Sequence, residues 1–147
     1  MIISGTELAK ERIIKLKAKA EHLKNELGRS PKLTVILVGE DPASEVYVGH
    51  KEKACKKVGI ESEIIKLPAD INQESLLNQI NQLNENTKVD GVLVQLPLPK
   101  HLSHLDPTDH IKAYKDVDGL TSENMGLMLK GKAWSEPCTP KGIMHLL

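Results

Sequence analysis

Tyr47 and Lys51 lie four positions apart in the segment SEVYVGHKEKACKKVG, for which Ser44 is the expected helix N-cap and Gly59 the expected end. In a helix this spacing brings a phenol and an amine to the same face. A lysine placed in this way can transfer protons, with the tyrosine shaping its surroundings, when burial or nearby cations bring its pKa towards neutrality. An exposed tyrosine on a solvated basic helix has the same spacing, so the pair alone leaves both interpretations open.

The Tyr-x-x-x-Lys spacing also occurs in short-chain dehydrogenases, where a glycine-rich nucleotide loop comes first. No G-x-G-x-x-G precedes Tyr47, and its absence excludes that interpretation. The loop GEDPAS before the helix has one glycine and is not followed by Gly-Lys-Ser, so it is not a phosphate loop either.

Three further side chains could take part in a site. Gln95 ends a segment that is otherwise apolar, and its amide could orient a reacting group or bond to the adjacent loop. Asp116 and Asp118 alternate in KDVDG, so their side chains could point the same way. This pair has three interpretations: a metal site, turn chemistry, or a carboxylate that accepts hydrogen bonds from the N–H edge of a heterocycle.

A group of histidines and aspartates follows the last apolar segment, in KHLSHLDPTDH. Such side chains can bind zinc or iron, but their spread over a loop and a short helix matches no closed ligand set. We therefore predict no metal here. The group comprises His101, His104, Asp106, Asp109 and His110.

Alternating helices and strands must position these residues. Apolar residues at steps of three and four predict three helices, over 4–28, 44–58 and 73–86. Short apolar runs predict three strands, over 33–38, 60–67 and 90–95, the second of them nearer a sheet edge. Ser4 and Asn72 are the expected caps of the first and third helices. The apolar stripe of the first helix comprises Ala9, Ile13, Leu16, Ala20, Leu23 and Leu27.

The order of these elements contains two βαβ units in series. Such units predict a parallel sheet with helices on both faces, that is, a three-layer α/β/α domain with about three to four strands. In these sheets ligands bind beyond the carboxyl ends of the strands. Two segments are therefore favoured: the loop and helix over 39–51, and QLPLP, which starts at Gln95.

Beyond Pro99 the patterns become short. DPTDHIKAY predicts a short helix capped by Asp106 with Pro107 first, and SENMGLMLKG predicts one or two helical turns. PCTPKGIMHLL predicts a helix capped by Thr139 and led by Pro140. This last pattern reaches the final residue without a stop signal, so we expect the chain to be part of a longer protein.

The composition of the 147 residues narrows the possible partners. Hydrophobic residues make up 39% and charged residues 27%, which is typical of one globular domain. Twenty basic residues balance twenty acidic ones and aromatics are 2%, which argues against nucleic acid or an anionic membrane as a partner. The sequence contains no signal core or membrane span, and Cys55 lies far from Cys138. We expect a cytoplasmic protein with two reduced thiols.

Four stretches occur in one order along nearly the whole chain: VGEDPASEVYVGHKEKACKKVGI, DGVLVQLPLPKHL, KDVDGLT and PCTPKG. Through them the chain resembles the amino-terminal domain of bifunctional methylenetetrahydrofolate dehydrogenase/methenyltetrahydrofolate cyclohydrolase. The resemblance implies a folate-binding catalytic domain over residues 1–147. The implied activities are NADP-dependent oxidation of 5,10-methylenetetrahydrofolate and hydrolysis of the methenyl product to 10-formyltetrahydrofolate.

The resemblance also implies roles for individual residues. Lys51 stands where the family has its catalytic lysine, Gln95 where it has the partner of that lysine, and Tyr47 where a tyrosine packs along the folate. Asp118 matches the aspartate that holds the pterin ring. The other implied substrate-binding residues are Ser44, Leu96 and Pro97.

The family's second domain, a dinucleotide-binding Rossmann unit, matches no segment of the chain. The resemblance therefore implies that NADP binds only in the complete enzyme, a homodimer, and that this part alone does not oxidise its substrate; its own oligomeric state stays open. Two other hypotheses also stay open. One is a stand-alone α/β module that holds a folate without turnover, and the other is a metal-binding regulatory domain built on residues 101–110.

Overall fold

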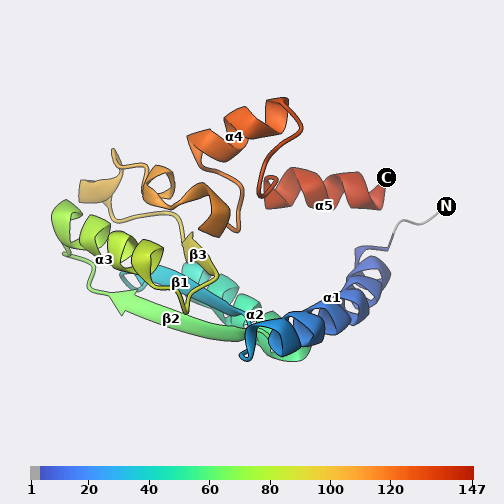
Figure 1. The fold of residues 1–147 in the computed structure, drawn as a ribbon. Helices are drawn as coiled ribbons and strands as arrows, with labels where there is room; N and C mark the ends of the chain where they lie inside the picture. The colour runs from blue at the N-terminus through green and yellow to red at the C-terminus, as the bar shows by residue number, and fades with distance from the viewer. Residues whose placement is uncertain (1–3) are drawn as a thin grey trace.

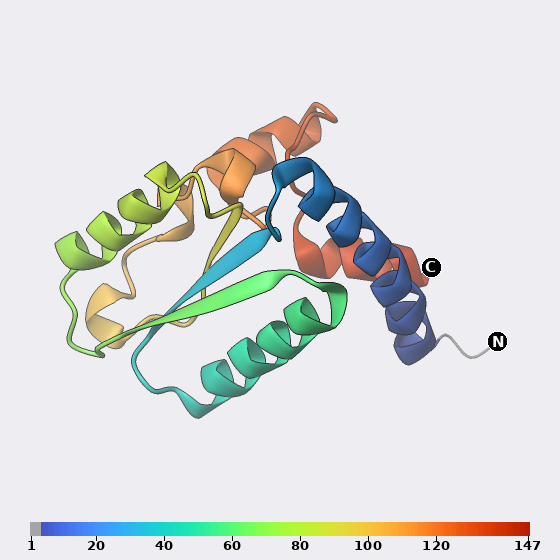
Figure 2. The ribbon, with the colours of Figure 1, turned by 60° about the horizontal axis from the view of Figure 1, so that its bottom comes forward.

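Three parallel strands form one sheet in the order β2–β1–β3. The computed structural model describes residues 4–147. The strands are β1 (Lys32–Val38), β2 (Glu61–Leu67) and β3 (Gly91–Val94), and the helices that connect them are α2 (Pro42–Val58) and α3 (Gln73–Glu85). Figure 2 shows α2 and α3 on opposite sides of the sheet, which confirms the predicted α/β/α layers and the small parallel sheet.

Side chains of the central strand β1 pack in two directions. Ile36 faces α3 and packs with Leu76, while Val35 faces α2 and packs with Val48. Successive side chains of a strand point to opposite faces, and both faces of this strand are covered by a helix. An unbroken apolar run is therefore required, and LTVILV supplies it.

β2 lies at one edge of the sheet. Its residues alternate between exposed and partly buried, whereas β1 is buried from Thr34 to Val38. The prediction that this strand is nearer an edge is confirmed. An edge strand has one neighbour and looser cover, so its apolar content can be lower.

The predicted caps of two helices are confirmed, and that of α2 is wrong. The side chains of Ser4 and Asn72 accept backbone N–H groups at the starts of their helices. α2 begins at Pro42 and not after Ser44, because the Asp41 carboxylate accepts the backbone N–H of Ser44 at 2.7 Å. Proline at the first helical position lacks the N–H that would need a partner, so Asp41-Pro42 is the better start.

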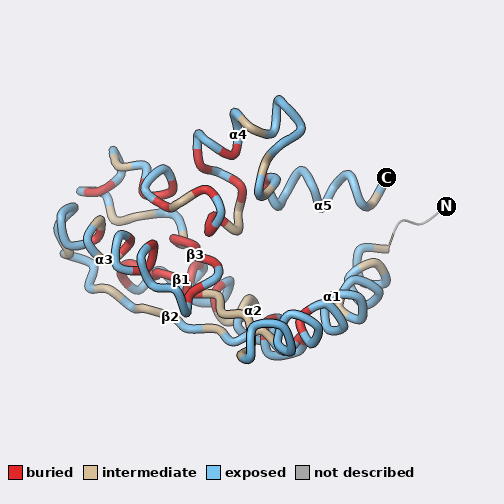
Figure 3. Tube along the Cα trace, in the orientation of Figure 1, coloured by how far each residue is buried: buried red, intermediate tan, exposed pale blue. Residues whose placement is uncertain are grey.

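α1 (Gly5–Leu27) forms as predicted but buries little of its apolar stripe. Ala20 is its only buried residue, and Leu16, Leu23 and Leu27 are between 42% and 49% exposed. Its main contact is α2, and Figure 1 shows it beside the sheet rather than over one face. Figure 3 shows the buried residues gathered in the sheet and in the segment after β3. None of the helices within residues 4–147 is both long and apolar enough to cross a membrane.

The segment after β3 is mostly irregular. The helix predicted over DPTDHIKAY is instead two single turns of 3-10 helix, Thr108–His110 and Ala113–Lys115, although the Asp106 carboxylate does accept the N–H of Thr108. α4 (Ser122–Leu129) follows as predicted. A further 3-10 turn, Lys100–Leu102, precedes them.

α5 (Cys138–Leu146) begins earlier than predicted. Pro137 is its N-cap, and Thr139 and Pro140 lie in its first turn, so Thr139 is not the cap. The N–H of Cys138 donates to the backbone oxygen of Asp118 at 3.3 Å. This bond to a distant loop satisfies an N–H at the start of the helix that a side-chain cap would otherwise accept.

Candidate functional site

The carboxyl ends of β1 and β3 lie side by side where the chain connections diverge. From β1 the chain passes through α2 to β2 at one edge, and from β2 it returns through α3 to β3 at the other edge. The crevice at such a switch point is the usual ligand site of open α/β sheets. Gln95 follows β3 there, and its backbone N–H donates to the oxygen of Ile36 at 2.9 Å.

Lys51 and Gln95 are in direct contact at this end of the sheet. The Lys51 Nζ donates to Gln95 Oε1 at 3.0 Å, and Gln95 Nε2 donates to the backbone oxygen of Leu96 at 2.8 Å. Both side chains are partly buried. Because the amide is neutral, it orients the amine without forming an ion pair with it. Residues 44 positions apart in the sequence are thus brought together by α2 and β3.

Tyr47 and Ser44 precede Lys51 on α2 and differ in exposure. Tyr47 is 61% exposed, one turn from Lys51, so its ring is accessible to a ligand. Ser44 is 3% exposed. Hydrogen bonds from the backbone N–H of Ser44, and then from its hydroxyl, lower the pKa of the Asp41 carboxyl. Ser44 is therefore held at the start of the helix through its backbone N–H.

Leu96 and Pro97 form an apolar edge beside Gln95. Both are exposed, and with Leu120 and residues 103–108 they line a hollow of about 630 Å³. Apolar side chains exposed around a hollow can cover the flat face of an aromatic or heterocyclic ligand. The structure thus places the two residues next to the Lys51–Gln95 contact.

Asp118 approaches the same region from the loop that follows the last 3-10 turn. It is partly buried, and the nearby Cys138 is influenced by both Asp118 and Lys51. Partial desolvation raises the pKa of the Cys138 thiol, the Asp118 carboxylate raises it further, and Lys141 and Lys51 lower it by smaller amounts. Asp118 lies beside Cys138, whose backbone N–H donates to the Asp118 oxygen, and the charge of Lys51 acts on the same thiol. Cys138 was not assigned to the site from the sequence, where the motif PCTPKG was its only signal.

Asp116, unlike Asp118, is turned into the protein. It is 4% exposed, and its carboxylate accepts hydrogen bonds from backbone N–H groups of its own loop and from Asn124. For this residue the structure supports turn chemistry. Asn124 is fully buried, and sequence reasoning did not single it out.

The histidines and aspartates of residues 101–110 bond to different partners. His101 Nε2 lies 2.8 Å from the oxygen of Ile71, and His104 Nε2 lies 3.1 Å from Gln73 Oε1. The Asp109 carboxylate accepts the N–H and the hydroxyl of a serine at the start of α4. Over the part of the chain that the structure describes, no three metal-ligating side chains come together.

The sequence is similar to those of known proteins. The family described as tetrahydrofolate dehydrogenase/cyclohydrolase, catalytic domain, matches residues 3–118. The chain belongs to this family. It is 45% identical over 146 residues to the bifunctional protein FolD of Legionella pneumophila (strain Corby), with 99% of this chain and 51% of the relative covered. To FolD of Bacillus mycoides (strain KBAB4) it is 48% identical over 147 residues, with 100% and 51% covered.

Solved structures of the family show the same fold. The bifunctional FolD enzyme of Campylobacter jejuni superposes with a TM-score of 0.92 at 41% identity, covering 100% of this chain and 52% of that one. The Trypanosoma brucei FolD, solved with NADP cofactor and inhibitor, has a TM-score of 0.91 at 33% identity, covering 100% and 50%. The chain spans about half the length of the curated relatives it matches.

NADP is the cofactor that the family implies, and residues 4–147 do not fit its phosphates. In nucleotide-binding α/β units the diphosphate rests on the N-terminus of the helix after the first strand. Here the Asp41 carboxylate already accepts the N–H of Ser44 at that position, and Glu40 stands beside it. Two acidic side chains at the helix start would repel a diphosphate.

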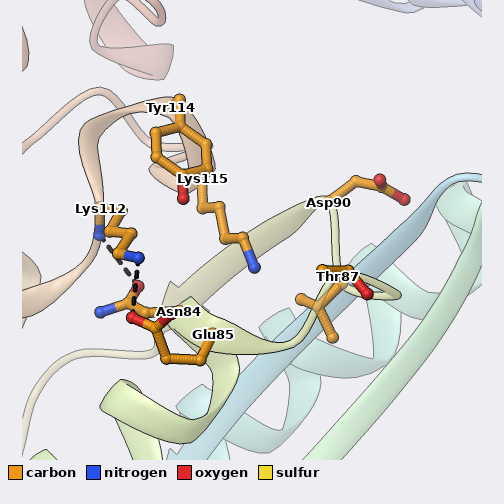
Figure 4. A pocket seen from close by; sticks show the side chains of 8 residues that line it. Asn84, Glu85, Thr87, Asp90, Lys112, Tyr114 and Lys115 are labelled. Carbon is orange, nitrogen blue, oxygen red and sulfur yellow. Dashed lines mark hydrogen bonds and ion pairs between the residues drawn. The ribbon is translucent and has the colours of Figure 1, made fainter.

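A second hollow, of about 400 Å³, lies at the amino end of β3 (Figure 4). Its two lysines already have partners: Lys112 Nζ donates to Glu85 at 2.7 Å, and Lys115 Nζ donates to the backbone oxygens of Leu83 and Asn86 at 2.8 Å each. Desolvation, and then Lys112, lower the pKa of the Lys115 ammonium. These bonds hold the carboxyl end of α3, so the lysines serve the fold.

Proposed function

We propose that residues 1–147 form the folate-binding catalytic domain of a methylenetetrahydrofolate dehydrogenase/methenyltetrahydrofolate cyclohydrolase. In the complete polypeptide the activities are NADP-dependent oxidation of 5,10-methylenetetrahydrofolate and hydrolysis of the methenyl product to 10-formyltetrahydrofolate. The observation that carries the proposal is the 3.0 Å bond between Lys51 Nζ and Gln95 Oε1 at the carboxyl end of β3, in a chain of this family.

Hydrolysis of the methenyl compound needs a group that accepts and returns a proton. In its neutral form the Lys51 amine accepts a proton from water as the water oxygen bonds to the methenyl carbon. The amine then gives the proton to ring nitrogen N5 as the bond from that carbon to N5 breaks. Loss of the hydroxyl proton completes the formyl group on N10. Gln95 keeps the amine directed at the reacting carbon through these steps.

Substrate binding is assigned to the groups around this contact. The Asp118 carboxylate accepts hydrogen bonds from the N–H edge of the pterin, for which its charge and partial exposure are suited. Tyr47 packs along the folate, and Leu96 and Pro97 cover its apolar surface. Ser44 belongs to this group by resemblance, and its burial supports an indirect role through the start of α2.

The dehydrogenase step requires NADP as the hydride acceptor. Within residues 4–147, the start of α2 does not suit the phosphates of NADP. The contribution of this chain to that step is therefore to hold the folate. We further propose that the complete enzyme is a cytoplasmic homodimer without a nucleic-acid partner. The equal numbers of basic and acidic residues within these 147 residues, 20 and 20, support the last point for this part of the enzyme.

The Lys51→Met variant of the complete polypeptide tests the assignment. We expect methenyltetrahydrofolate hydrolysis to fall by about 100-fold or more, because general acid–base catalysis typically contributes 10²–10⁴-fold. Hydrolysis is followed by the loss of methenyl absorbance, and NADP-dependent oxidation is measured in parallel.

Lys53→Met is the matched control, since Lys53 is exposed on the same helix and should be dispensable. Unchanged hydrolysis in Lys51→Met would exclude the proposed role of the lysine. If the unmodified polypeptide bound folate but turned over neither substrate, a non-catalytic folate-binding module would be the better description.

A further inference from the structure

The Asp116 carboxylate is surrounded by uncharged hydrogen-bond donors. Its Oδ1 accepts the backbone N–H groups of Asp118 at 3.1 Å and Gly119 at 2.9 Å. Its Oδ2 accepts the N–H of Thr121 at 2.9 Å and Asn124 Nδ2 at 3.0 Å. Hydrogen bonds to a charged acceptor are stronger than neutral ones. The loop over 116–121 is thus wrapped around one buried carboxylate.

Asn124 extends this network towards α5. Its Nδ2 also donates to the oxygen of Ala113 at 2.8 Å, and its Oδ1 accepts the N–H of Trp134 at 3.2 Å. It is 0% exposed. A buried polar network whose members are all bonded holds a single geometry. The network therefore ties the loop to the segment that leads into Cys138.

The Asp118 backbone is held at both of its hydrogen-bonding groups. Its N–H is bound to Asp116, and its oxygen accepts the N–H of Cys138. The preceding residue, Val117, packs into the apolar cluster of β1 and β3, which includes Val35. Asp118 itself stays partly exposed. A fixed backbone with an accessible carboxylate is what ligand binding requires.

We propose that Asp116, together with Asn124, is a positioning residue for folate binding. The pair sets where the Asp118 carboxylate stands, and neither side chain touches the ligand. This inference rests on the proposed function, which assigns the heterocycle to Asp118. Because a misplacement of about 1 Å can cost on the order of 100-fold in activity, a network that fixes the Asp118 backbone matters without any ligand contact.

The Asp116→Asn variant of the complete polypeptide tests the inference. The amide has nearly the same volume, but its NH₂ faces two of the four donors whichever way it turns. We expect the KM for the methenyl substrate to rise at least about tenfold as Asp118 shifts. The kcat for hydrolysis and its pH profile should stay within about threefold, since Lys51 and Gln95 are not contacted.

A double-mutant cycle with Asp118→Asn separates positioning from a general loss of structure. If Asp116 acts through Asp118, the double variant has the KM of Asp118→Asn alone. Independent effects would multiply, and that result would overturn the inference. Leu76→Ala is the stability control, because Leu76 is fully buried between α3 and the sheet and takes no part in the four bonds to Asp116. Its folate KM should be unchanged.

Asn124→Ser replaces Asp116→Asn if that variant does not fold. It removes one of the four bonds, so a smaller rise in KM with the same lack of additivity is expected. An unchanged KM in a folded variant of Asp116 or Asn124 overturns the positioning inference alone. An unchanged KM in Asp118→Asn overturns the assignment of the heterocycle, and with it the proposed function of that residue.

Discussion

The two halves of the candidate site are built in different ways. Lys51 stands on α2 and Gln95 directly follows β3, and both elements are held by apolar packing around the central strand. Asp118 stands on an irregular loop that is held by hydrogen bonds to the buried carboxylate of Asp116. The lysine half depends on periodic apolar residues, and the aspartate half depends on a small number of polar groups in one arrangement.

This difference predicts different responses to substitution. Loss of apolar volume lowers stability in proportion to the cavity and leaves the geometry of the folded site nearly unchanged. Loss of one member of a polar network leaves buried donors without acceptors and changes local geometry. Variants of the sheet should therefore affect unfolding, and variants of the loop should affect folate binding.

Leu76→Ala should give the largest loss of stability. Leu76 is fully buried between α3 and the sheet, and such truncations lower the free energy of unfolding by about 2–5 kcal/mol. Urea unfolding measures the loss, and kcat/KM of the folded protein should be unchanged. Leu77→Ala, at a half-buried neighbour, should cost clearly less. A large change in folate KM without a loss of stability would contradict the comparison.

Gly119→Ala should have the largest effect on the aspartate half. Gly119 has φ of 69°, and a Cβ there would lie 2.5 Å from the backbone carbon of Glu136. The loop and the segment before α5 would have to separate, so we expect kcat/KM for methenyl hydrolysis to fall by about 100-fold.

Gly131→Ala is the matched control for this variant. Gly131 has φ of 64° with nothing within 4 Å of its added Cβ, so it carries the backbone strain of about 1–2 kcal/mol without the collision. Equal losses of activity in the two variants would show that strain, and not the contact with Glu136, disrupts the site.

Arg29→Met should have the smallest effect on stability. It removes the partner of the exposed Asp90 carboxylate, in contrast to the buried carboxylate of Asp116. Arg29 donates two hydrogen bonds to Asp90 at 2.7 and 2.8 Å, and this pairing is the main reason that the pKa of Asp90 lies below its usual 3.8. Both side chains are about one-third exposed and the solvent screens the pair, so the pair stabilises the fold only slightly.

The contribution of the Arg29–Asp90 pair to stability changes with pH in a defined direction. A lowered pKa in the folded state adds stability that is fully present above pH 3.8 and is lost as the pH falls through the lowered pKa. Urea unfolding at pH 7 and in acid should therefore show the Arg29→Met deficit shrinking as the pH falls below about 4. A deficit that persists in acid would mean that Arg29 acts through packing. Arg12→Met, on the exposed face of α1, is the control.

The sequence by itself determined the order of the elements, the parallel sheet and the caps at Ser4 and Asn72, because these depend on local periodicity and on adjacent residues. It also placed Lys51 and Gln95 near the carboxyl ends of strands, through the chain order of the βαβ units. The caps at Ser44 and Thr139 were wrong because both helices begin earlier: Asp41 accepts the N–H of Ser44 at the start of α2, and the Asp118 oxygen accepts the N–H of Cys138 at the start of α5.

Only the tertiary structure decided how much of each pattern is buried and which polar groups meet. The apolar stripe of α1 predicted a helix. The exposure of that stripe depends on what packs against it, and the periodicity of the sequence does not encode this packing. Asp116 and Asp118 look alike in KDVDG, and the fold turned one inward to hold the loop and left the other partly exposed at the site. The 3.0 Å contact between Lys51 and Gln95, 44 residues apart, required α2 and β3 to pack around one strand, because long-range contacts form only when the core closes.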